Sequence, residues 1–182
     1  SMITISKEIE LAPGYDLSKL GPLNELIFFD IETTGFTPNS SSLYLIGVVY
    51  QKSGSWQLKQ WFADSMAAEQ ELLTSFFDFI TKYKSLVHFN GDSFDIPYLK
   101  KCAAQYGIHP TFDQIQSFDI YRKARPIRRL LGLENLKQKS IETFLGLDRF
   151  DQFNGGQLIE FYKEYLTTKD NNLYQFLLLH NE

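Results

Sequence analysis

The sequence predicts an α/β domain in which a mixed sheet is flanked by helices. Three observations lead to this fold class. Residues 26–29 form an apolar run typical of a strand that is buried on both faces, and two β-rich runs joined by a short polar turn follow. Short apolar strands then alternate with helical patterns. A hairpin that leads into strand–helix–strand units gives antiparallel pairs in one part of a sheet and parallel pairs in the other.

The first part of the chain is expected to build the antiparallel half of this sheet. Residues 43–51 and 56–62 are predicted strands that form an antiparallel meander with the strand at residue 26. Residues 1–25 are expected to be an extension packed beside the first strand, with a short edge strand at residues 3–9 as one option. Residues 26–182 are expected to form the main domain.

The remaining elements follow from helical and strand periodicity. Residues 66–83 are a predicted helix with Ser65 as N-cap, because large apolar residues recur on one face at helical spacing. Further predictions are a strand at 85–89, a helix to about residue 106 that ends before Gly107, a strand at 116–120, and helices at about 120–131, 136–144, 156–166 and 172–182.

Composition limits the class of protein. The chain has 182 residues, of which 43% are apolar and 15% aromatic, so one folded domain is expected. The single cysteine, Cys102, excludes an internal disulfide and favours a reducing, cytoplasmic location. No apolar run approaches the length of a membrane span, so no membrane-spanning segment is expected. The net charge of −4 argues against a general positive field that coats nucleic acid, but it allows an enzyme that holds a few nucleotides.

The first acidic motif, Asp30-Ile31-Glu32-Thr33-Thr34-Gly35, ends the predicted first strand. Side chains on a strand alternate between faces, so Asp30 and Glu32 are expected on one face. A carboxylate directly after a buried run is costly unless it is paired or bound to a metal, and two hard oxygen ligands favour Mg²⁺ or Mn²⁺. A frayed strand end that meets solvent or a lysine is the alternative. Residues 33–35 are expected to turn the chain, and Gly35 is able to take a positive φ there.

The second acidic motif spans residues 88–99. A strand turns through Asn90-Gly91 into a helix whose first turn contains Asp95 and Pro97, a position where proline is tolerated. Asp92 and Ser93 are expected to be ordinary capping residues. For Asp95 a role other than capping is implied by the family resemblance described below.

The two motifs, in this order and at this separation, resemble those of the DEDD superfamily of 3′–5′ exonucleases, whose domains have the ribonuclease H-like fold. The resemblance covers about residues 26–182. It implies that Asp30, Glu32 and Asp95 ligate two divalent ions, Mg²⁺ or Mn²⁺. It further implies a metal-dependent enzyme that hydrolyses phosphodiester bonds at the 3′ end of single-stranded DNA or RNA. Asp119, which ends the strand at 116–120, is expected to support a loop or cap a helix rather than bind metal.

A third element lies at residues 177–182. His180 matches the histidine of the family's last motif and is implied to orient or deprotonate the attacking water, whereas a partly buried helix histidine is the alternative. The matching aspartate would fall beyond Glu182, and we expect that the sequence was cut within this helix. If the natural chain ended there, Glu182 would have to substitute, or the domain would be a non-catalytic relic. The pattern over residues 161–181 resembles a bacterial subgroup of predicted exonuclease domains.

Residues 122–129 contain five basic residues in an otherwise acidic chain. They are either a solvated helix face or a patch that contacts the phosphates of a single strand. Phe36 and Phe94 are candidates to stack on the terminal base, with a core role as the alternative. The expected nucleic-acid contacts are therefore Thr33, Gly35, Phe36, Asn90, Phe94, Arg125, Arg128 and Arg129.

Two other functions compete with the exonuclease. One is a non-catalytic nucleic-acid-binding or protein-interaction module that keeps the fold but has lost a carboxylate. The other is an endonuclease of the same broad fold, which a substrate without a free 3′ end would distinguish. The choice between DNA and RNA stays open, because no residue indicates a contact with a 2′-hydroxyl group.

Overall fold

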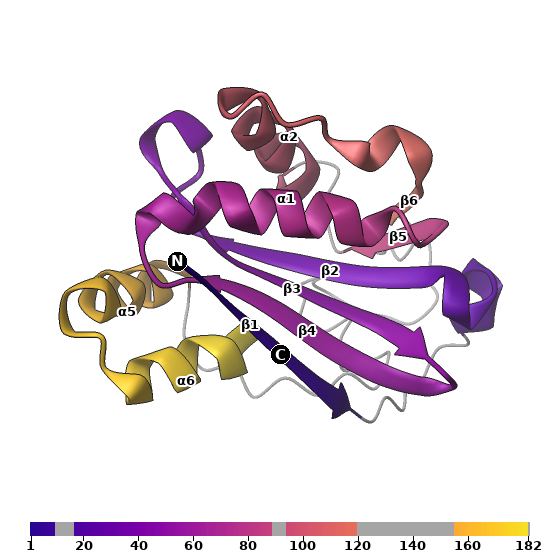
Figure 1. The fold of residues 1–182 in the computed structure, drawn as a ribbon, viewed down its shortest axis with the longest axis horizontal. Helices are drawn as coiled ribbons and strands as arrows, with labels where there is room; N and C mark the ends of the chain where they lie inside the picture. Colours follow the sequence, from indigo (N-terminus) through magenta and orange to yellow (C-terminus); the bar gives the residue numbers. More distant parts are fainter. Residues whose placement is uncertain (10–16, 89–93, 120–154, 182) are drawn as a thin grey trace, which may run out of the picture.

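The computed structural model describes residues 1–9, 17–88, 94–119 and 155–181, and its elements are arranged around one mixed sheet (Figure 1). The strands are β1 (Met2–Ile9), β2 (Leu26–Thr33), β3 (Leu43–Lys52), β4 (Ser55–Ala63), β5 (Ser85–His88) and β6 (Gln116–Asp119). The α-helices are α1 (Glu69–Ile80), α2 (Asp95–Gln105), α5 (Gly155–Thr168) and α6 (Asn171–Asn181). Short 3₁₀ turns lie at Leu17–Leu20, Leu23–Glu25, Pro38–Ser40, Met66–Ala68 and Thr111–Gln114.

The strand order is β1-β4-β3-β2-β5-β6. The pairs β1–β4, β4–β3 and β3–β2 are antiparallel, whereas β2–β5 and β5–β6 are parallel. The predicted fold class, a mixed sheet flanked by helices, is therefore confirmed. β2 lies where the two halves meet, which explains why its first residues, Leu26 and Ile27, are completely buried.

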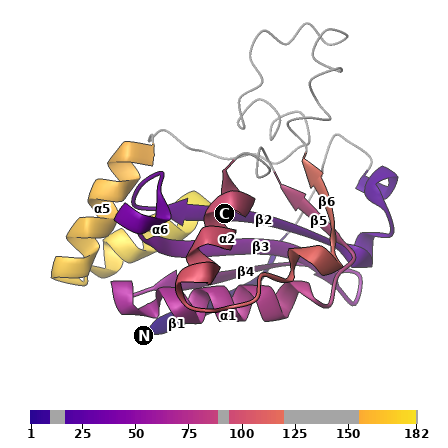
Figure 2. The same cartoon turned by 90° about the horizontal axis from the view of Figure 1, so that it is seen from above.

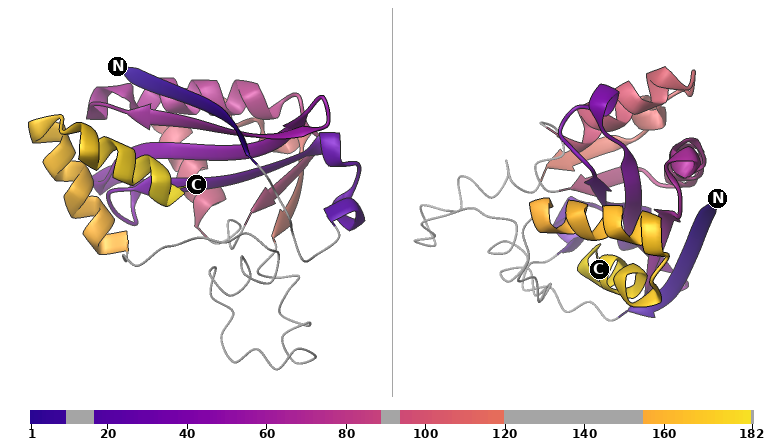
Figure 3. Two further views of the ribbon diagram at one scale, coloured as in Figure 1. Left: turned by 90° about the horizontal axis from the view of Figure 1, so that it is seen from below. Right: turned by 90° about the vertical axis from the view of Figure 1, so that its left-hand side faces the viewer.

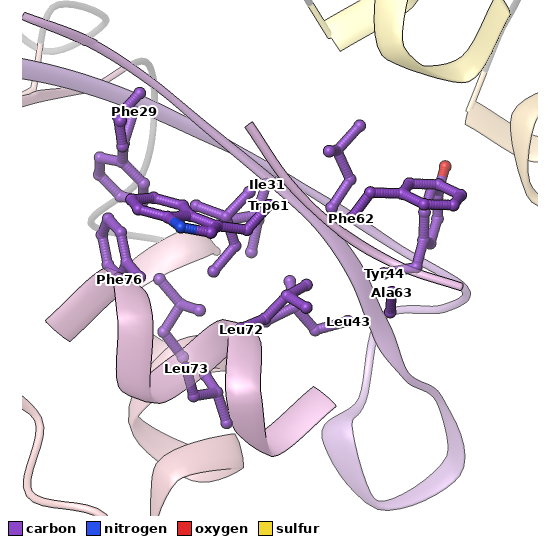
Figure 4. Packing of buried hydrophobic residues seen from close by; sticks show 14 of the residues in the cluster. Phe29, Ile31, Leu43, Tyr44, Trp61, Phe62, Ala63, Leu72, Leu73 and Phe76 are labelled. Atoms are coloured by element: carbon purple, nitrogen blue, oxygen red, sulfur yellow. The ribbon is translucent and has the colours of Figure 1, made fainter. Parts of the chain in front are cut away.

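Helices cover both faces of the sheet (Figures 2 and 3). On one face α1 packs across β3 and β4, with α2 against it. Figure 4 shows Phe29, Ile31 and Trp61 facing Leu72 and Phe76 on this side. On the other face α5 and α6 pack on the aromatic residues Tyr44 and Phe62, whose rings contact Tyr162 at centroid distances of 4.0 and 5.8 Å.

The short edge strand that the sequence offers at residues 3–9 is confirmed, but it does not lie beside the first strand of the motif, β2. β1 pairs with β4 from Met2↔Ala63 to Ile9↔Trp56, at the outer edge of the meander, and not beside β2. The physical reason is that both edges of β2 are already used, by β3 on one side and by the parallel strand β5 on the other. β4 offers the open edge.

Several predicted boundaries also change. The predicted helix at residues 66–83 is a 3₁₀ turn followed by α1, and Ser65 makes no capping hydrogen bond through its side chain. Gly107 follows α2 with φ of +66°, as predicted for a residue that ends a helix. The predicted helices at 120–131 and 136–144 lie outside the described residues. In the described part of the chain, no helix is both long and apolar enough to span a membrane.

Candidate active site

Asp30 and Glu32 occupy alternate positions near the end of β2, where both are partly buried. Phe29, which precedes Asp30, and Ile31, which lies between the two acids, face α1. The two carboxylates therefore lie on the opposite face, the one that α6 covers. The sheet register places Gly47 of β3 beside Asp30 and Leu45 beside Glu32. The strand period thus brings both acids together, as the sequence predicts.

Asp95, from the second acidic motif, lies near Asp30 and Glu32. It is the first residue of α2 and only 8% exposed. Burial raises the pKa of this carboxyl group well above its ordinary value, and the nearby charges of Asp30, Glu32 and Asp119 raise it further. The two acidic motifs therefore converge in space, and they do so closely enough to oppose one another's ionisation.

This donor set fits hard divalent cations. Carboxylates that raise one another's pKa are stabilised when a cation neutralises them, and oxygen ligands are those that Mg²⁺ and Mn²⁺ prefer. Within the described ranges no three acidic, histidine or cysteine side chains are already arranged around a single point that could hold an ion. Asp30, Glu32 and Asp95 are nevertheless coupled electrostatically, because the charges of the first two raise the pKa of the third.

The loop after β2 is held in a defined shape. Thr33 Oγ1 donates a hydrogen bond of 2.7 Å to the carbonyl of Gly35, and the Thr34 and Ser42 backbones are linked across the loop. A Cβ atom on Gly35 would lie 2.9 Å from Cβ of Ser41. Gly35 does not use the positive φ that is open to glycine, since its φ is not among the positive values of the described glycines. Glycine is required here for space.

Phe36 extends from this loop and is 88% exposed. Its ring meets that of Phe94 at a centroid distance of 6.3 Å in an edge-to-face arrangement, and Phe94 directly precedes Asp95. Phe94 in turn contacts Tyr98 at 5.5 Å. An aromatic pair therefore lies beside the carboxylates, and Phe36 offers a ring face to the surroundings.

Other groups near the site make contacts that the sequence does not predict, and one of them is Asp119, for which only a role in a loop or a helix cap is expected. His88 and Asp119 are buried cross-strand neighbours whose Nδ1 and Oδ2 atoms are 4.0 Å apart, and His88 Nε2 lies 2.5 Å from Ser117 Oγ. Tyr98 on α2 hydrogen-bonds Ser41 in the loop after β2. Only the tertiary structure reveals these contacts, since the partners are distant in sequence and of common residue types.

The remaining predicted site residues are only partly placed. His180 lies in the last turn of α6, a helix that packs against β2, but its side chain is outside the described part. Asn90, Arg125, Arg128 and Arg129 lie outside the described residues, so their roles stay predictions.

Comparisons with known proteins assign the family. The model of the RNase_H superfamily matches residues 27–182, and the chain belongs to that superfamily. This confirms the ribonuclease H-like superfamily and fold that the two motifs predict, whereas the bacterial subgroup stays a prediction.

Individual relatives are larger proteins. The chain is 30% identical over 148 residues to DNA polymerase 1 of Sulfurisphaera ohwakuensis, an alignment that covers 64% of this chain and 17% of the polymerase. The family B DNA polymerase of Pyrobaculum calidifontis matches 86% of this chain with 22% of its own, at 16% identity and a TM-score of 0.57. Exonuclease I of E. coli in complex with a dA16 oligonucleotide matches 85% of this chain with 43% of its own, at 14% identity and a TM-score of 0.50. The chain thus spans less than half of each of these proteins.

Proposed function

We propose that this domain is a metal-dependent 3′–5′ exonuclease acting on single-stranded nucleic acid. The observation that carries the proposal is the convergence of Asp30, Glu32 and Asp95, seen in the raised pKa of Asp95. Structural ion clusters also perturb pKa values, but three carboxylates that oppose one another stabilise no fold. A bound multivalent cation would offset this mutual opposition.

The three carboxylates would hold the ions. When bound, two divalent ions supply the charge that activates a water molecule and stabilises the leaving 3′ oxygen. The chain's own part is to fix the oxygen ligands on rigid elements, the end of β2 and the first turn of α2. His180 is proposed to orient or deprotonate the attacking water from the last turn of α6.

The substrate end is proposed to lie against Phe36. An exposed ring beside a metal site stacks on any base, and such stacking contributes about 1–3 kcal/mol per base without regard to sequence. Thr33 and Gly35 lie in the same loop and would contact the terminal nucleotide. Because the structure of exonuclease I from E. coli contains a dA16 oligonucleotide, single-stranded DNA is the first substrate to test.

The decisive experiment combines Mn²⁺ titration with strand cleavage. Isothermal calorimetry on the native chain is expected to give two ions per chain, and Asp30→Asn should abolish tight binding. Asp78→Asn is the matched control, because Asp78 is an exposed carboxylate on α1. If the native chain binds Mn²⁺ no better than Asp30→Asn does, the carboxylates have a structural role and the proposal fails.

Cleavage assays then separate the possible activities. A 5′-labelled single strand should shorten one nucleotide at a time, and a strand with a blocked 3′ end should resist. Cleavage of a single-stranded circle would instead show an endonuclease. Tight binding of the strand without any cleavage, with both ions bound, would favour a non-catalytic binding module.

A further inference from the structure

Gln60 of β4 is an unusual residue for its surroundings. It is 1% exposed, on a strand whose neighbouring side chains are mostly apolar. Its side-chain amide donates a hydrogen bond of 2.8 Å to the backbone carbonyl of Leu178 in α6. Burying an amide costs free energy unless it is paired, and an apolar residue would fill the same space without that cost. The bond to α6 is therefore one interaction that offsets the cost of burying Gln60.

The position of Gln60 connects this bond to the candidate active site. Cross-strand register pairs Gln60 with Gly47, and Gly47 with Asp30. Residues in such a row share one face of the sheet, so Gln60 and Asp30 lie on the face that α6 covers, two strands apart. Gly47 between them has no side chain. The hydrogen bond thus attaches α6 to the same row of residues that contains the first carboxylate.

The contact on α6 lies in the part of the helix that bears His180. Leu178 precedes His180 by two residues, and Leu177, which is 2% exposed, precedes it by three. Positions three apart share a helix face, so the position of His180 is on the face that Leu177 buries. α6 crosses the sheet on the side opposite α1 (Figure 3).

Apolar contacts alone leave the register of such a helix poorly defined. Around this contact α6 packs through leucine side chains and through Tyr174, whose ring meets Phe62 at 5.1 Å. Dispersion contacts are weakly directional, whereas a hydrogen bond tolerates only a narrow range of distance and angle. One buried hydrogen bond therefore selects one position of the helix along the sheet.

We propose that Gln60 is a positioning residue, which fixes α6 so that His180 stays in register with Asp30 and Glu32. This inference rests on the proposed function. Gln60 touches neither substrate nor ions in this scheme, and it acts through the backbone of α6. It predicts that loss of the amide loosens the last turns of α6 and leaves the carboxylates intact.

The test compares Gln60→Met with Gln57→Met. Methionine keeps the length of the side chain and suits an apolar setting, so the fold should survive. Gln57 lies on the same strand three residues earlier, on the opposite face, and is partly exposed. For Gln60→Met we expect at least 10-fold faster amide exchange in residues 174–181, with α1 unchanged. The NMR signals of the His180 ring should also shift, whereas those of His88 and His109 should not.

Kinetic and binding measurements complete the test. Gln60→Met should lower kcat on the order of 10²-fold, the cost of a small misplacement in an active site, with KM changed less than about twofold. Mn²⁺ affinity should stay as in the native chain. Gln57→Met should match the native chain throughout.

Each outcome separates the two proposals. Suppose that the native chain cleaves no substrate, and that amide exchange in α6 still rises in Gln60→Met. Gln60 then does fix α6 on the sheet, and the exonuclease proposal fails. If the native chain cleaves and Gln60→Met equals it in kcat, Gln60 is not a positioning residue, whatever happens to exchange. Unchanged exchange and unchanged His180 signals would also overturn the inference.

Discussion

The hydroxyl groups of Tyr98 and Ser41 lie 2.8 Å apart and join α2 to the loop after β2. The Ser41 hydroxyl donates to the carbonyl of Thr37 at 2.5 Å, so Tyr98 is the donor in the bond to Ser41. Burial is the main cause that raises the pKa of Tyr98, which keeps its proton in place for this bond. The bond ties the helix that begins with Asp95 to the loop that bears Phe36.

Removing this hydroxyl group should weaken substrate binding more than folding. Tyr98→Phe loses one hydrogen bond, so the free energy of unfolding should fall by about 1 kcal/mol. We expect KM for a single strand to rise severalfold, because Phe36 is held less firmly, while Mn²⁺ affinity stays unchanged. Urea unfolding, steady-state kinetics and calorimetry measure these quantities. Tyr83→Phe, at the far end of α1, is the control, and an equal KM in both variants would contradict the prediction.

Gly35 should not accept even one methyl group. Alanine would place its Cβ 2.9 Å from Cβ of Ser41, which has no flexible end that could move aside. We expect Gly35→Ala to destabilise the protein by about 1–3 kcal/mol and to displace the loop that bears Phe36. Thermal unfolding checks the first effect, and binding of a fluorescent single strand checks the second.

The second variant for this position removes the obstacle. In Gly35→Ala combined with Ser41→Gly, the clash is gone, so much of the lost stability should return. Ser41→Gly alone sets the cost of the lost hydrogen bonds. Strict additivity of the two single changes would show that the Cβ contact is not the cause.

The pKa of Asp95 predicts how stability depends on pH. In the folded chain the carboxyl group has a pKa raised by burial and by the charges of Asp30 and Glu32 above its ordinary value of 3.8. The fold therefore favours the protonated form. The contribution of protonated Asp95 to the free energy of unfolding is complete below the pKa that this carboxyl group has in the unfolded chain. It is lost as pH rises through the pKa that the group has in the folded chain.

Asp95→Asn should flatten this dependence. At neutral pH without divalent ions we expect the variant to be more stable than the native chain by on the order of 1 kcal/mol, because active-site carboxylates are costly. Urea midpoints at a series of pH values measure the difference, with Asp78→Asn as control. Added Mn²⁺ should stabilise the native chain and Asp78→Asn, but not Asp95→Asn. A native chain that gains stability between about pH 4 and about pH 8 relative to Asp95→Asn would contradict the sign.

Local patterns explain which parts of the fold the sequence could predict. The apolar run before Asp30, the hairpin of β3 and β4, and the helical spacing in α1 are each set by neighbours in sequence. The partner of β1 is not, because pairing with β4 depends on which sheet edge stays open. The sequence also does not indicate the N-terminal end of α1, because its first residue, Glu69, binds Leu43 of β3 and Tyr106, which directly follows α2.

The candidate site shows the same division. The shared face of Asp30 and Glu32 follows from strand period, and the position of Asp95 at the start of a helix follows from a motif, whereas their role as metal ligands stays a prediction. Gln60 could not be singled out, because a glutamine in a β-rich run is normally an outward-facing residue. Its role depends on a helix more than a hundred residues later, 118 positions from Gln60 to Leu178. Contacts of such long range are properties of the assembled fold.

Glu69 is buried and connects α1 to β3 and to the residue that follows α2. It is 5% exposed, and its Oε2 accepts from the Leu43 amide at 2.6 Å while its Oε1 accepts from the Tyr106 hydroxyl at 2.7 Å. Burial and this bond raise the pKa of Tyr106 to about 12. Glu69→Gln would turn one oxygen into an NH₂ group, which must either face the Leu43 N–H or make the Tyr106 hydroxyl accept in place of donating, and the charge is lost in both cases. We therefore expect a loss of about 2 kcal/mol by urea unfolding. Exposed Glu71→Gln should cost nothing measurable. In a double-mutant cycle, Tyr106→Phe should reduce the cost of Glu69→Gln, because the NH₂ group could then face the vacated side. Additive effects would show that the Tyr106 hydroxyl and the Glu69 carboxylate do not interact.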